Sequence, residues 1–464
     1  MQLDYRTYLL TGLLIVLSGC ASPQISDQLR PELRPLKKDI TYYPFQQVTA
    51  ADTSLLADVP TGEITLQTAL SLALVKNPEL ATFSWEVRAQ EARTLQAGLF
   101  PNPELSIEAE NFRGPGVAQG FNTAENTIAL SQIIELGGKR KKRIRSATLN
   151  HNLAGWDYEA KRLAVLTEVT KLFIEVLAAQ ERLVLTGQLV DLSEKVYSAV
   201  TERVKTGKVS PVEETRAWAS LSTVRIESER SKRKLESAIK RLSYTWGSTS
   251  GTSMQALGEL EDIDSIPSAE QLVKMVSQNP DIGRWNDEIS QRQAALELEK
   301  ARRIPDLSFS GGTRHLNETD INAFVLEMSL PLTIFNRNQG SIMEAHYRIS
   351  KAEAERRAAE LGVLSRLAES YGSLTISYSE VIALRNDVLP AVESAFDAVI
   401  AGYDQGKFGY LDVLDAQRTL FEAKDQYIEM LATYHKAKAD VERLIGQSID
   451  TMGKPKEENK KDIL

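Results

Sequence analysis

The sequence has few of the side chains from which catalytic and metal-binding centres are usually built. Among its 464 residues there are one cysteine, Cys20, and four histidines. The histidines lie far apart, and none is near the cysteine: His151, His315, His346 and His435. We find no glycine-rich phosphate loop and no nucleophile paired with a base. The sequence therefore predicts neither an enzyme nor a bound metal or other cofactor.

The sequence also lacks an excess of positive charge and any long apolar run beyond its first twenty residues. The formal net charge is -8, which argues against a nucleic-acid partner because such proteins present a basic face. A transmembrane helix needs about 18 or more consecutive apolar residues, and no later segment provides them. If the chain crosses a membrane, it must do so with β-strands.

The first twenty residues have the pattern of an export signal. An apolar run from Leu9 to Leu17 precedes the small residues Ser18 and Gly19, as in a signal peptide. The sequence LSGC (17–20) resembles a bacterial lipobox, in which the cysteine is acylated and becomes the first mature residue. Since no aspartate follows Cys20, we expect a palmitate-bearing lipoprotein at the outer membrane of a Gram-negative bacterium.

The chain contains two copies of one long pattern. Two landmarks recur at an offset of 202 residues and a third at an offset of 199, in the same order: NPEL (77–80) with NPDI (279–282), PELS (103–106) with PDLS (305–308), and TGKVSPVEETRAW (206–218) with QGKFGYLDVLDAQ (405–417). A repeat of this length indicates duplication of a fold unit. In both copies asparagine precedes a proline, the N-cap and first-position signal of a helix.

A β-hairpin is predicted next in each copy, over about 103–134 and 305–332. The strand 104–112 alternates between an apolar and an acidic face, and the strand 320–332 alternates similarly. The apolar positions are Leu105, Ile107 and Ala109 in the first and Phe324, Leu326, Met328 and Leu330 in the second. Each strand has about the ten residues that cross a membrane as β-structure. Polar or glycine-rich turns are predicted at 113–122 and 315–319.

Very long helices follow the hairpins, from about Lys139 to Arg203 and from about Asn338 to Tyr403. At about 1.5 Å per residue each would be roughly 100 Å long, and Pro390 should kink or restart the second. Apolar residues at coiled-coil spacing predict a packing seam on each: Leu149, Leu153, Trp156, Ala160 and Leu163, then Leu364, Ala368, Tyr371, Leu374, Tyr378 and Val381. Glycine turns then send the chain back as helices over 211–246 and 411–446.

Four spanning strands are too few for one chain to form a complete membrane structure. Barrels need about eight strands, and open strand edges cannot face lipid. Several copies must therefore pool their strands, with the long helices continuing the barrel as a tube. The basic run after the first hairpin lies where such a barrel meets the periplasm, within reach of lipid phosphates, unless it is only a solvated helix start: Lys139, Arg140, Lys141, Lys142 and Arg143.

Over residues 63–447 the sequence resembles the TolC-like outer-membrane efflux proteins, and its N-terminal half resembles their heavy-metal cation-efflux (CzcC-like) branch. The two Asn-Pro landmarks, LFPNPELSIEAENF (99–112), LSQIIELGGKRKKR (130–143) and GKFGYLDVLDAQRTL (406–420) carry the resemblance. It implies a mainly α fold with a small β part: two repeats of helix, β-hairpin, long helix and helix. Three chains would form a twelve-stranded β-barrel and a twelve-helix α-barrel.

The resemblance also implies how the chain is divided. The expected segments are a lipoprotein signal peptide (1–19), a lipidated linker and equatorial segment (20–62), repeat 1 (63–247), an equatorial linker (248–267), repeat 2 (268–447) and a disordered tail (448–464). The glycine turns would be periplasmic tips that contact an adaptor protein, which bridges to an inner-membrane pump of the RND type. The tip residues are Gly207, Lys208, Gly406, Lys407 and Gly409.

Two carboxylates follow the second tip at positions i and i+3, Asp412 and Asp415, and so share one helix face. In a trimer they would form rings of carboxylates, which favour cations and repel anions. The resemblance makes them a periplasmic gate that Tyr403 helps to latch, with Glu213 of the other hairpin as its partner. The alternative is that Asp412 is only a helix N-terminal charge.

The most concrete function predicted is an exit duct for metal cations in a tripartite efflux system. A duct of the same fold could instead serve multidrug efflux or type I secretion. A periplasmic coiled-coil lipoprotein that only scaffolds its partners is a third hypothesis, which the predicted strands disfavour.

Overall fold

The computed structural model describes residues 62–116, 120–249 and 254–449. All of these residues belong to one unit of the chain, Arg34–Leu464. The predicted signal peptide, residues 20–61 of the predicted linker with Cys20, and residues 450–464 of the predicted tail lie outside the described residues. The first two residues of the predicted tail, Ser448 and Ile449, are described and are buried. In the described part, no helix is both long and apolar enough to cross a lipid bilayer.

The chain is mainly helical and carries the predicted element order twice. Repeat 1 contains α3 (Pro78–Ala97), β2 (Glu104–Glu110), β3 (Glu125–Ile134), α4 (Lys139–Lys205) and α5 (Pro211–Tyr244). Repeat 2 contains α7 (Pro280–Arg302), β5 (Leu307–Leu316), β6 (Ile321–Ser329), α8 (Gln339–Ala383), α9 (Leu389–Asp404) and α10 (Tyr410–Ile445). The predicted fold class and its two repeats are confirmed.

Short elements precede each repeat. The helix α2 (Leu66–Lys76) comes before α3, and α6 (Ala269–Met275) with a 3-10 turn (Val276–Gln278) comes before α7. The strands β1 (Gly62–Thr65) and β4 (Met254–Leu257) form a parallel pair. The side-chain amide of Gln180 occupies the outer edge of β4, because it accepts from the N–H and donates to the carbonyl of Ala256 at 2.8 and 3.0 Å.

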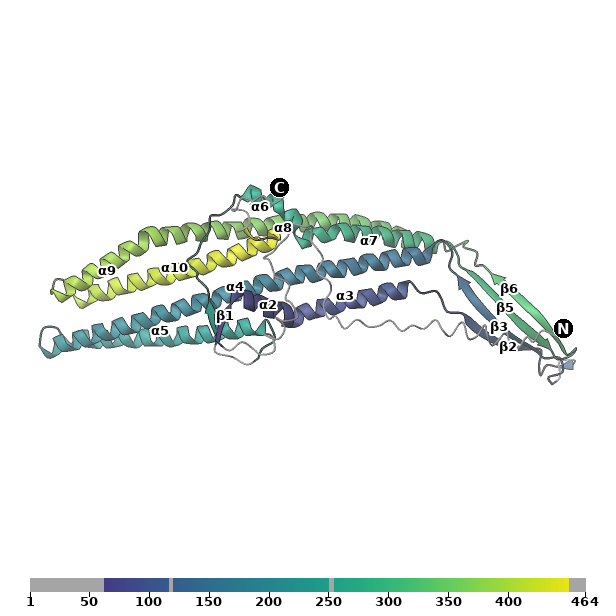
Figure 1. The fold of residues 1–464 in the computed structure, drawn as a ribbon, viewed down its shortest axis with the longest axis horizontal. Helices are drawn as coiled ribbons and strands as arrows, with labels where there is room; N and C mark the ends of the chain where they lie inside the picture. The colour runs from purple at the N-terminus through teal and green to yellow at the C-terminus, as the bar shows by residue number, and fades with distance from the viewer. Residues whose placement is uncertain (1–61, 117–119, 250–253, 450–464) are drawn as a thin grey trace, which may run out of the picture. The chain divides into compact units, whose positions relative to one another are not determined.

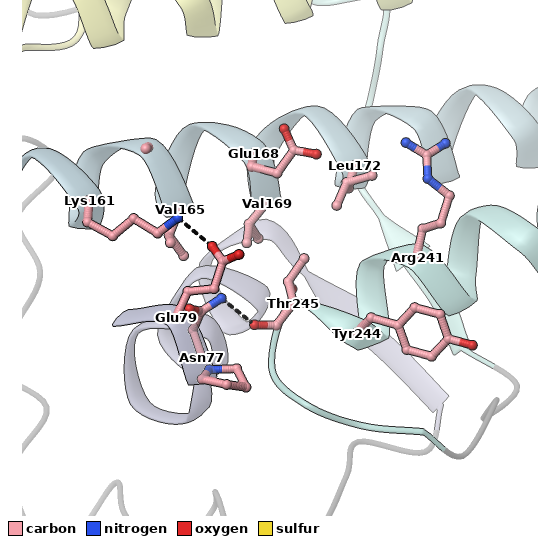
Figure 2. A pocket seen from close by; sticks show the side chains of 12 residues that line it. Asn77, Glu79, Lys161, Val165, Glu168, Val169, Leu172, Arg241, Tyr244 and Thr245 are labelled. Atoms are coloured by element: carbon pink, nitrogen blue, oxygen red, sulfur yellow. Dashed lines mark hydrogen bonds and ion pairs between the residues drawn. The ribbon is translucent and has the colours of Figure 1, made fainter. Parts of the chain in front are cut away.

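The Asn-Pro landmarks begin helices as the sequence predicts, and they also join each repeat to its own end. Asn77 caps α3 by accepting from the N–H of Leu80 at 2.8 Å and donates to the carbonyl of Thr245 at 2.7 Å (Figure 2). Asn279 caps α7 and donates to the carbonyl of Leu444 at 2.9 Å. Two polar functions of one side chain therefore fix the start of one helix against the end of another.

The long helices lie side by side as a layer, and no other described long helix packs against its two outer helices. Its first half has the order α3, α4, α7 and α8, and along its second half α4 packs against α5 and α10. The four long strands form one antiparallel sheet in the order β2-β3-β5-β6, with β2 and β6 at its edges (Figure 1). Within the chain, α3 and β2 form one boundary of these layers and α8 and β6 form the other.

The predicted seam of α8 is partly wrong. Tyr371, Leu374 and Tyr378 pack into the core of repeat 2 and Val381 packs into the cluster that contains residues of α4, but Leu364 and Ala368 are exposed. Val363 and Leu367 are buried in their place, one position earlier in the sequence.

Pro390 follows a π-helical turn (Leu384–Val388), after which the helix continues as α9. The wider turn accommodates a residue that has no N–H to donate and whose ring crowds the preceding turn.

Candidate functional site

The β-sheet has two chemically different faces. Strand register places Ile107, Ile128, Thr313 and Phe324 in one row across the four strands. The same face carries further apolar side chains along every strand: Leu105, Leu130, Phe309, Leu326 and Met328. Phe324 is 90% exposed and Leu326 is 76% exposed. Contiguous exposed apolar area of this kind is typical of a surface that meets a partner or a membrane.

The opposite face of the sheet is polar. A row of carboxylates and hydroxyls crosses all four strands: Glu104, Ser131, Ser310 and Glu327. Farther along, Arg314 donates to Glu125 at 2.9 Å and to the hydroxyl of Thr127 at 2.9 Å, and it lies 3.5 Å from Glu110. Sequence reasoning found the acidic alternation of β2 but missed Arg314. This face suits contact with water.

Both helical hairpins end in the same tight turn. Gly207 and Gly406 have positive φ angles of 73° and 77°. The residue after each glycine donates its N–H to a carbonyl five positions earlier, at 2.9 Å for Lys208 and 2.8 Å for Lys407. This is the Schellman arrangement, in which glycine at the left-handed position carries no Cβ penalty. The predicted tip residues are therefore exposed turn residues, and Gly409 precedes the first residue of α10.

The predicted gate carboxylates are exposed and each has a partner in its own helix. Asp412 accepts from the N–H of Gly409 at 2.8 Å, which caps the N-terminus of α10. Asp415 accepts from Arg418 at 2.9 Å. This hydrogen bond supports the alternative reading of Asp412 as a carboxylate that caps the start of a helix. A capping carboxylate still keeps its negative charge, so this contact does not remove it from an electrostatic role.

Tyr403 is buried where the two tips meet, and its close charged neighbour is Arg203. The guanidinium of Arg203 lies 3.9 Å from the centre of the Tyr403 ring and donates to the Tyr403 carbonyl at 3.0 Å. Burial raises the pKa of the Tyr403 phenol; the charge of Arg203 opposes this rise, and that of Glu213 adds to it. The phenol oxygen makes no hydrogen bond to a described residue. Sequence reasoning missed Arg203.

Apolar side chains from all four tip helices surround this contact. Val200, Ala217, Tyr403, Tyr410 and Val413 form one small buried cluster. Burial also raises the pKa of Tyr410, so both phenols are neutral at physiological pH. The two hairpin tips therefore adhere through a local apolar core with a single cation at its margin.

The predicted basic cluster is largely occupied by contacts within the chain. Lys139 is buried and pairs with Asp306 at 2.7 Å. Arg143 pairs with Glu135 at 2.5 Å and donates to the Ala97 carbonyl, and Arg140 donates to the Gly98 carbonyl at 2.6 Å. Lys142 lies 3.7 Å from Glu297, and Lys141 is exposed. Most of these cations fasten the start of α4 to α3 and to the region around β5.

A hollow of about 530 Å³ lies beside the joint of α3, α4 and α5, which Figure 2 shows. Val165, Val169 and Leu172 of α4 supply part of its wall. Its two cations are already engaged, Lys161 with Glu79 and Arg241 with Glu175. No group of three or more metal-ligating side chains occurs among the described residues.

Comparison with known proteins relates this architecture to bacterial efflux. The model of the outer membrane efflux protein family matches residues 69–248 and 272–447, which are the two repeats. The cobalt-zinc-cadmium resistance protein CzcC of Cupriavidus metallidurans is 35% identical over 386 residues, covering 83% of this chain and 91% of that protein. The nickel-cobalt-cadmium resistance protein NccC of Alcaligenes xylosoxydans xylosoxydans is 25% identical, covering 64% of this chain and 66% of its own length.

Solved structures share the fold. The open state of the MtrE outer membrane channel of Neisseria gonorrhoeae superposes with a TM-score of 0.68 at 19% identity, covering 82% of this chain and 89% of that chain. The double repeat, the two-faced sheet and the matched sequence range lead to one conclusion: the chain belongs to the outer membrane efflux protein family.

Proposed function

We propose that this protein is the outer-membrane exit duct of a tripartite system that exports heavy-metal cations. The observation that carries the proposal is the four-stranded sheet, which has one apolar face, one polar face and two edges that pair with no other described strand. In lipid, each unpaired backbone group costs several kcal/mol. Copies of the chain must therefore join edge to edge, and three copies supply the twelve strands expected for this family.

The proposed cargo rests on the named relatives and on charge. CzcC and NccC are named for resistance to cobalt, zinc, cadmium and nickel. The polar face of the sheet carries Glu104, Glu108 and Glu327, and the second tip carries Asp412 and Asp415. A water-filled path lined by carboxylates favours cations over anions. The duct itself carries out no reaction in this proposal.

We further infer the attachments of the duct. Acylation of Cys20 would anchor the chain in the outer membrane, and the exposed Lys141 could meet lipid phosphates. The turns at Gly207 and Gly406, with Lys208, Lys407 and Gly409, would contact a periplasmic adaptor that bridges to an inner-membrane RND pump. Asp412, Asp415, Tyr403 and Glu213 would form the gate at this periplasmic end.

Growth of a clean deletion strain tests the cargo. We expect sensitivity to zinc, cobalt, cadmium or nickel, restored by the wild-type gene, with unchanged tolerance of a panel of drugs. Complementation with Asp412→Ala/Asp415→Ala should restore less metal tolerance than the wild type at equal protein level. Drug sensitivity without metal sensitivity would contradict metal export and favour a drug duct, and no change in either would contradict efflux altogether.

A further inference from the structure

One loop displays large apolar side chains that none of the described residues covers. It links β6 to α8, and its exposed side chains are Leu330, Leu332, Ile334 and Phe335. Phe335 is 90% exposed and Leu332 is 78% exposed. The loop is held in a definite shape, because Arg337 donates to the Ile334 carbonyl at 3.1 Å and Asn338 donates to Glu299 at 2.7 Å. A fixed loop that presents a phenylalanine outward has the form of a docking knob.

A hollow of about 510 Å³ lies on the opposite side of the layer, where the end of α3 and the loop that leads to β2 meet the start of α4. Its apolar wall is Ala97, Leu99, Phe100 and Pro101, and its charged side chains are Arg93, Glu135 and Arg143. Leu99 and Phe100 are themselves exposed, at 49% and 68%. The loop 98–101 is fastened from behind, because Arg140 stacks on Phe100 at 3.9 Å and donates to the Gly98 carbonyl.

Knob and hollow lie at the same level of the helical layer. Asn338 beside the knob donates to Glu299 of α7. Two residues earlier, Glu297 of α7 lies 3.7 Å from Lys142 of α4. Arg143, the next residue of α4, donates to the Ala97 carbonyl beside the hollow at 2.8 Å. This row of contacts crosses the layer from its α8 boundary to its α3 boundary, at the junction of helices and sheet.

We propose that Phe335 of one copy of this chain inserts beside Leu99 and Phe100 of the next copy. The inference rests on the proposed function, since it says where the copies of the duct dock. The knob belongs to the β6–α8 boundary and the hollow to the α3–β2 boundary, so each copy offers one of each. Contacts of this head-to-tail kind close into a ring when the rotation between neighbouring copies divides a full turn evenly. Arg93 is placed to stack on the inserted ring.

Disulfide trapping tests this docking. Full-length protein that keeps Cys20 and carries Phe335→Cys and Leu99→Cys would be oxidised in the outer membrane, since an acylated Cys20 has no free thiol. We expect covalent trimers on non-reducing gels, dimers when the two single variants are co-expressed, and none from either variant alone. A matched control is Phe324→Cys with Leu99→Cys, because Phe324 is equally exposed but lies within β6, among the residues of the apolar sheet face.

The outcomes distinguish failure of the docking contact from failure of the proposed duct function. Native mass measurement of the same sample reports the number of copies. A trimer that the 335–99 cysteine pair does not trap would overturn the docking contact but not the proposed duct. The exposed side chains of the β6–α8 loop would then face lipid. A chain that remains monomeric would overturn both proposals. As a second readout, Phe335→Glu should reduce the heat-resistant trimer at least tenfold, whereas Phe335→Leu should preserve it.

Discussion

Among the described residues, Arg203 is the cation that reaches from one hairpin tip to the other. It contacts the ring and the carbonyl of Tyr403, two hundred residues away in the sequence. A stacked, partly buried guanidinium and one charge-assisted hydrogen bond together contribute on the order of 1–2 kcal/mol. If the tips are the closed end of the duct, removing this contact should let them separate more often.

We therefore expect Arg203→Ala to increase leakage through the duct. The measurement is single-channel conductance in planar bilayers, with cell sensitivity to a bulky hydrophilic antibiotic as a second readout. Arg203→Lys keeps the charge but loses the planar stack, so it should give an intermediate value. Arg230→Ala removes an exposed arginine that pairs only within its own helix and should change nothing. Equal conductance of wild type and Arg203→Ala would contradict the role of this contact.

His435 of α10 should make the stability of the fold depend on pH. Its Nε2 lies 2.8 Å from the Leu260 carbonyl, and Tyr434 packs edge-on against the ring. Burial lowers the pKa of His435 below its usual 6.5; Lys438 lowers it further, while the Leu260 carbonyl, Asp262 and Asp264 raise it. Between this lowered pKa and 6.5 the unfolded chain binds a proton that the folded chain does not.

Stability should therefore be fully present above pH 6.5 and fall as the pH is lowered below it. We expect the thermal unfolding midpoint to drop between pH 7.5 and pH 5.5, and His435→Gln to reduce that drop. His346→Gln is the control, because His346 is exposed. An identical pH dependence in wild type and His435→Gln would exclude this histidine as its source.

At the scale of elements, the sheet depends on one of two adjacent glycines. A Cβ at Gly312 would lie 2.2 Å from the Ile128 carbonyl oxygen and 2.7 Å from Ala129, so β3 and β5 could not keep their register. A Cβ at Gly311 would meet only the end of the Leu326 side chain, at 3.4 Å. The backbone of β3 cannot move aside as the end of the Leu326 side chain can, so alanine should be tolerated at position 311 and not at position 312.

We expect Gly312→Ala to abolish most of the heat-modifiable oligomer in the outer-membrane fraction, and Gly311→Ala to leave it near the wild-type level. Gel mobility with and without boiling, at matched expression, measures this. Comparable yields from the two variants would show that the strands tolerate the extra methyl group and would contradict the close approach.

Local patterns predicted the elements well where one physical rule dominates. Period-two alternation identified both faces of β2 and β6, and the Asn-Pro pairs identified two helix starts. The first part of the α8 seam was displaced by one position because two adjacent residues, which point in different directions from a helix, are both apolar: Val363 is buried and Leu364 is exposed. A hydrophobic pattern cannot distinguish a helix face that packs within the chain from an apolar face that is exposed at the edge of the helical layer.

At the scale of the molecule, contacts between residues two hundred positions apart were beyond reach of the sequence. Glu213 matches Asp412 in position across the repeat and was therefore expected beside Tyr403, but the repeat gave no reason to pair Tyr403 with Arg203. The basic run 139–143 similarly looked like a surface for lipid, although Lys139 and Arg143 are held by Asp306 and Glu135. Charge in a sequence marks where ion pairs are possible, and only the packing of distant segments decides which are made.

The row of carboxylates and hydroxyls on the polar face of the sheet gives the proposed duct a second site of ion selectivity, in addition to the hairpin tips. Glu104 and Glu327 stand at the two edges of the sheet, in register through Ser131 and Ser310. In a three-fold ring of copies, the three Glu104 side chains would form one ring of carboxylates and the three Glu327 side chains another. Glu110 and Glu125, by contrast, share the charge of Arg314. Uncompensated carboxylates in a narrow aqueous path should therefore dominate its selectivity.

We expect wild-type channels in a salt gradient to show a reversal potential that indicates cation preference, and Glu104→Gln/Glu327→Gln to shift it toward zero. Ser131→Ala/Ser310→Ala alters the same row without altering charge and should leave the potential unchanged. The shift should shrink as salt rises from 0.1 M to 1 M, because the Debye length falls from about 10 to about 3 Å. If only Asp412→Ala/Asp415→Ala moves the potential, selection occurs at the tips alone, and the sheet provides a passage that does not discriminate by charge.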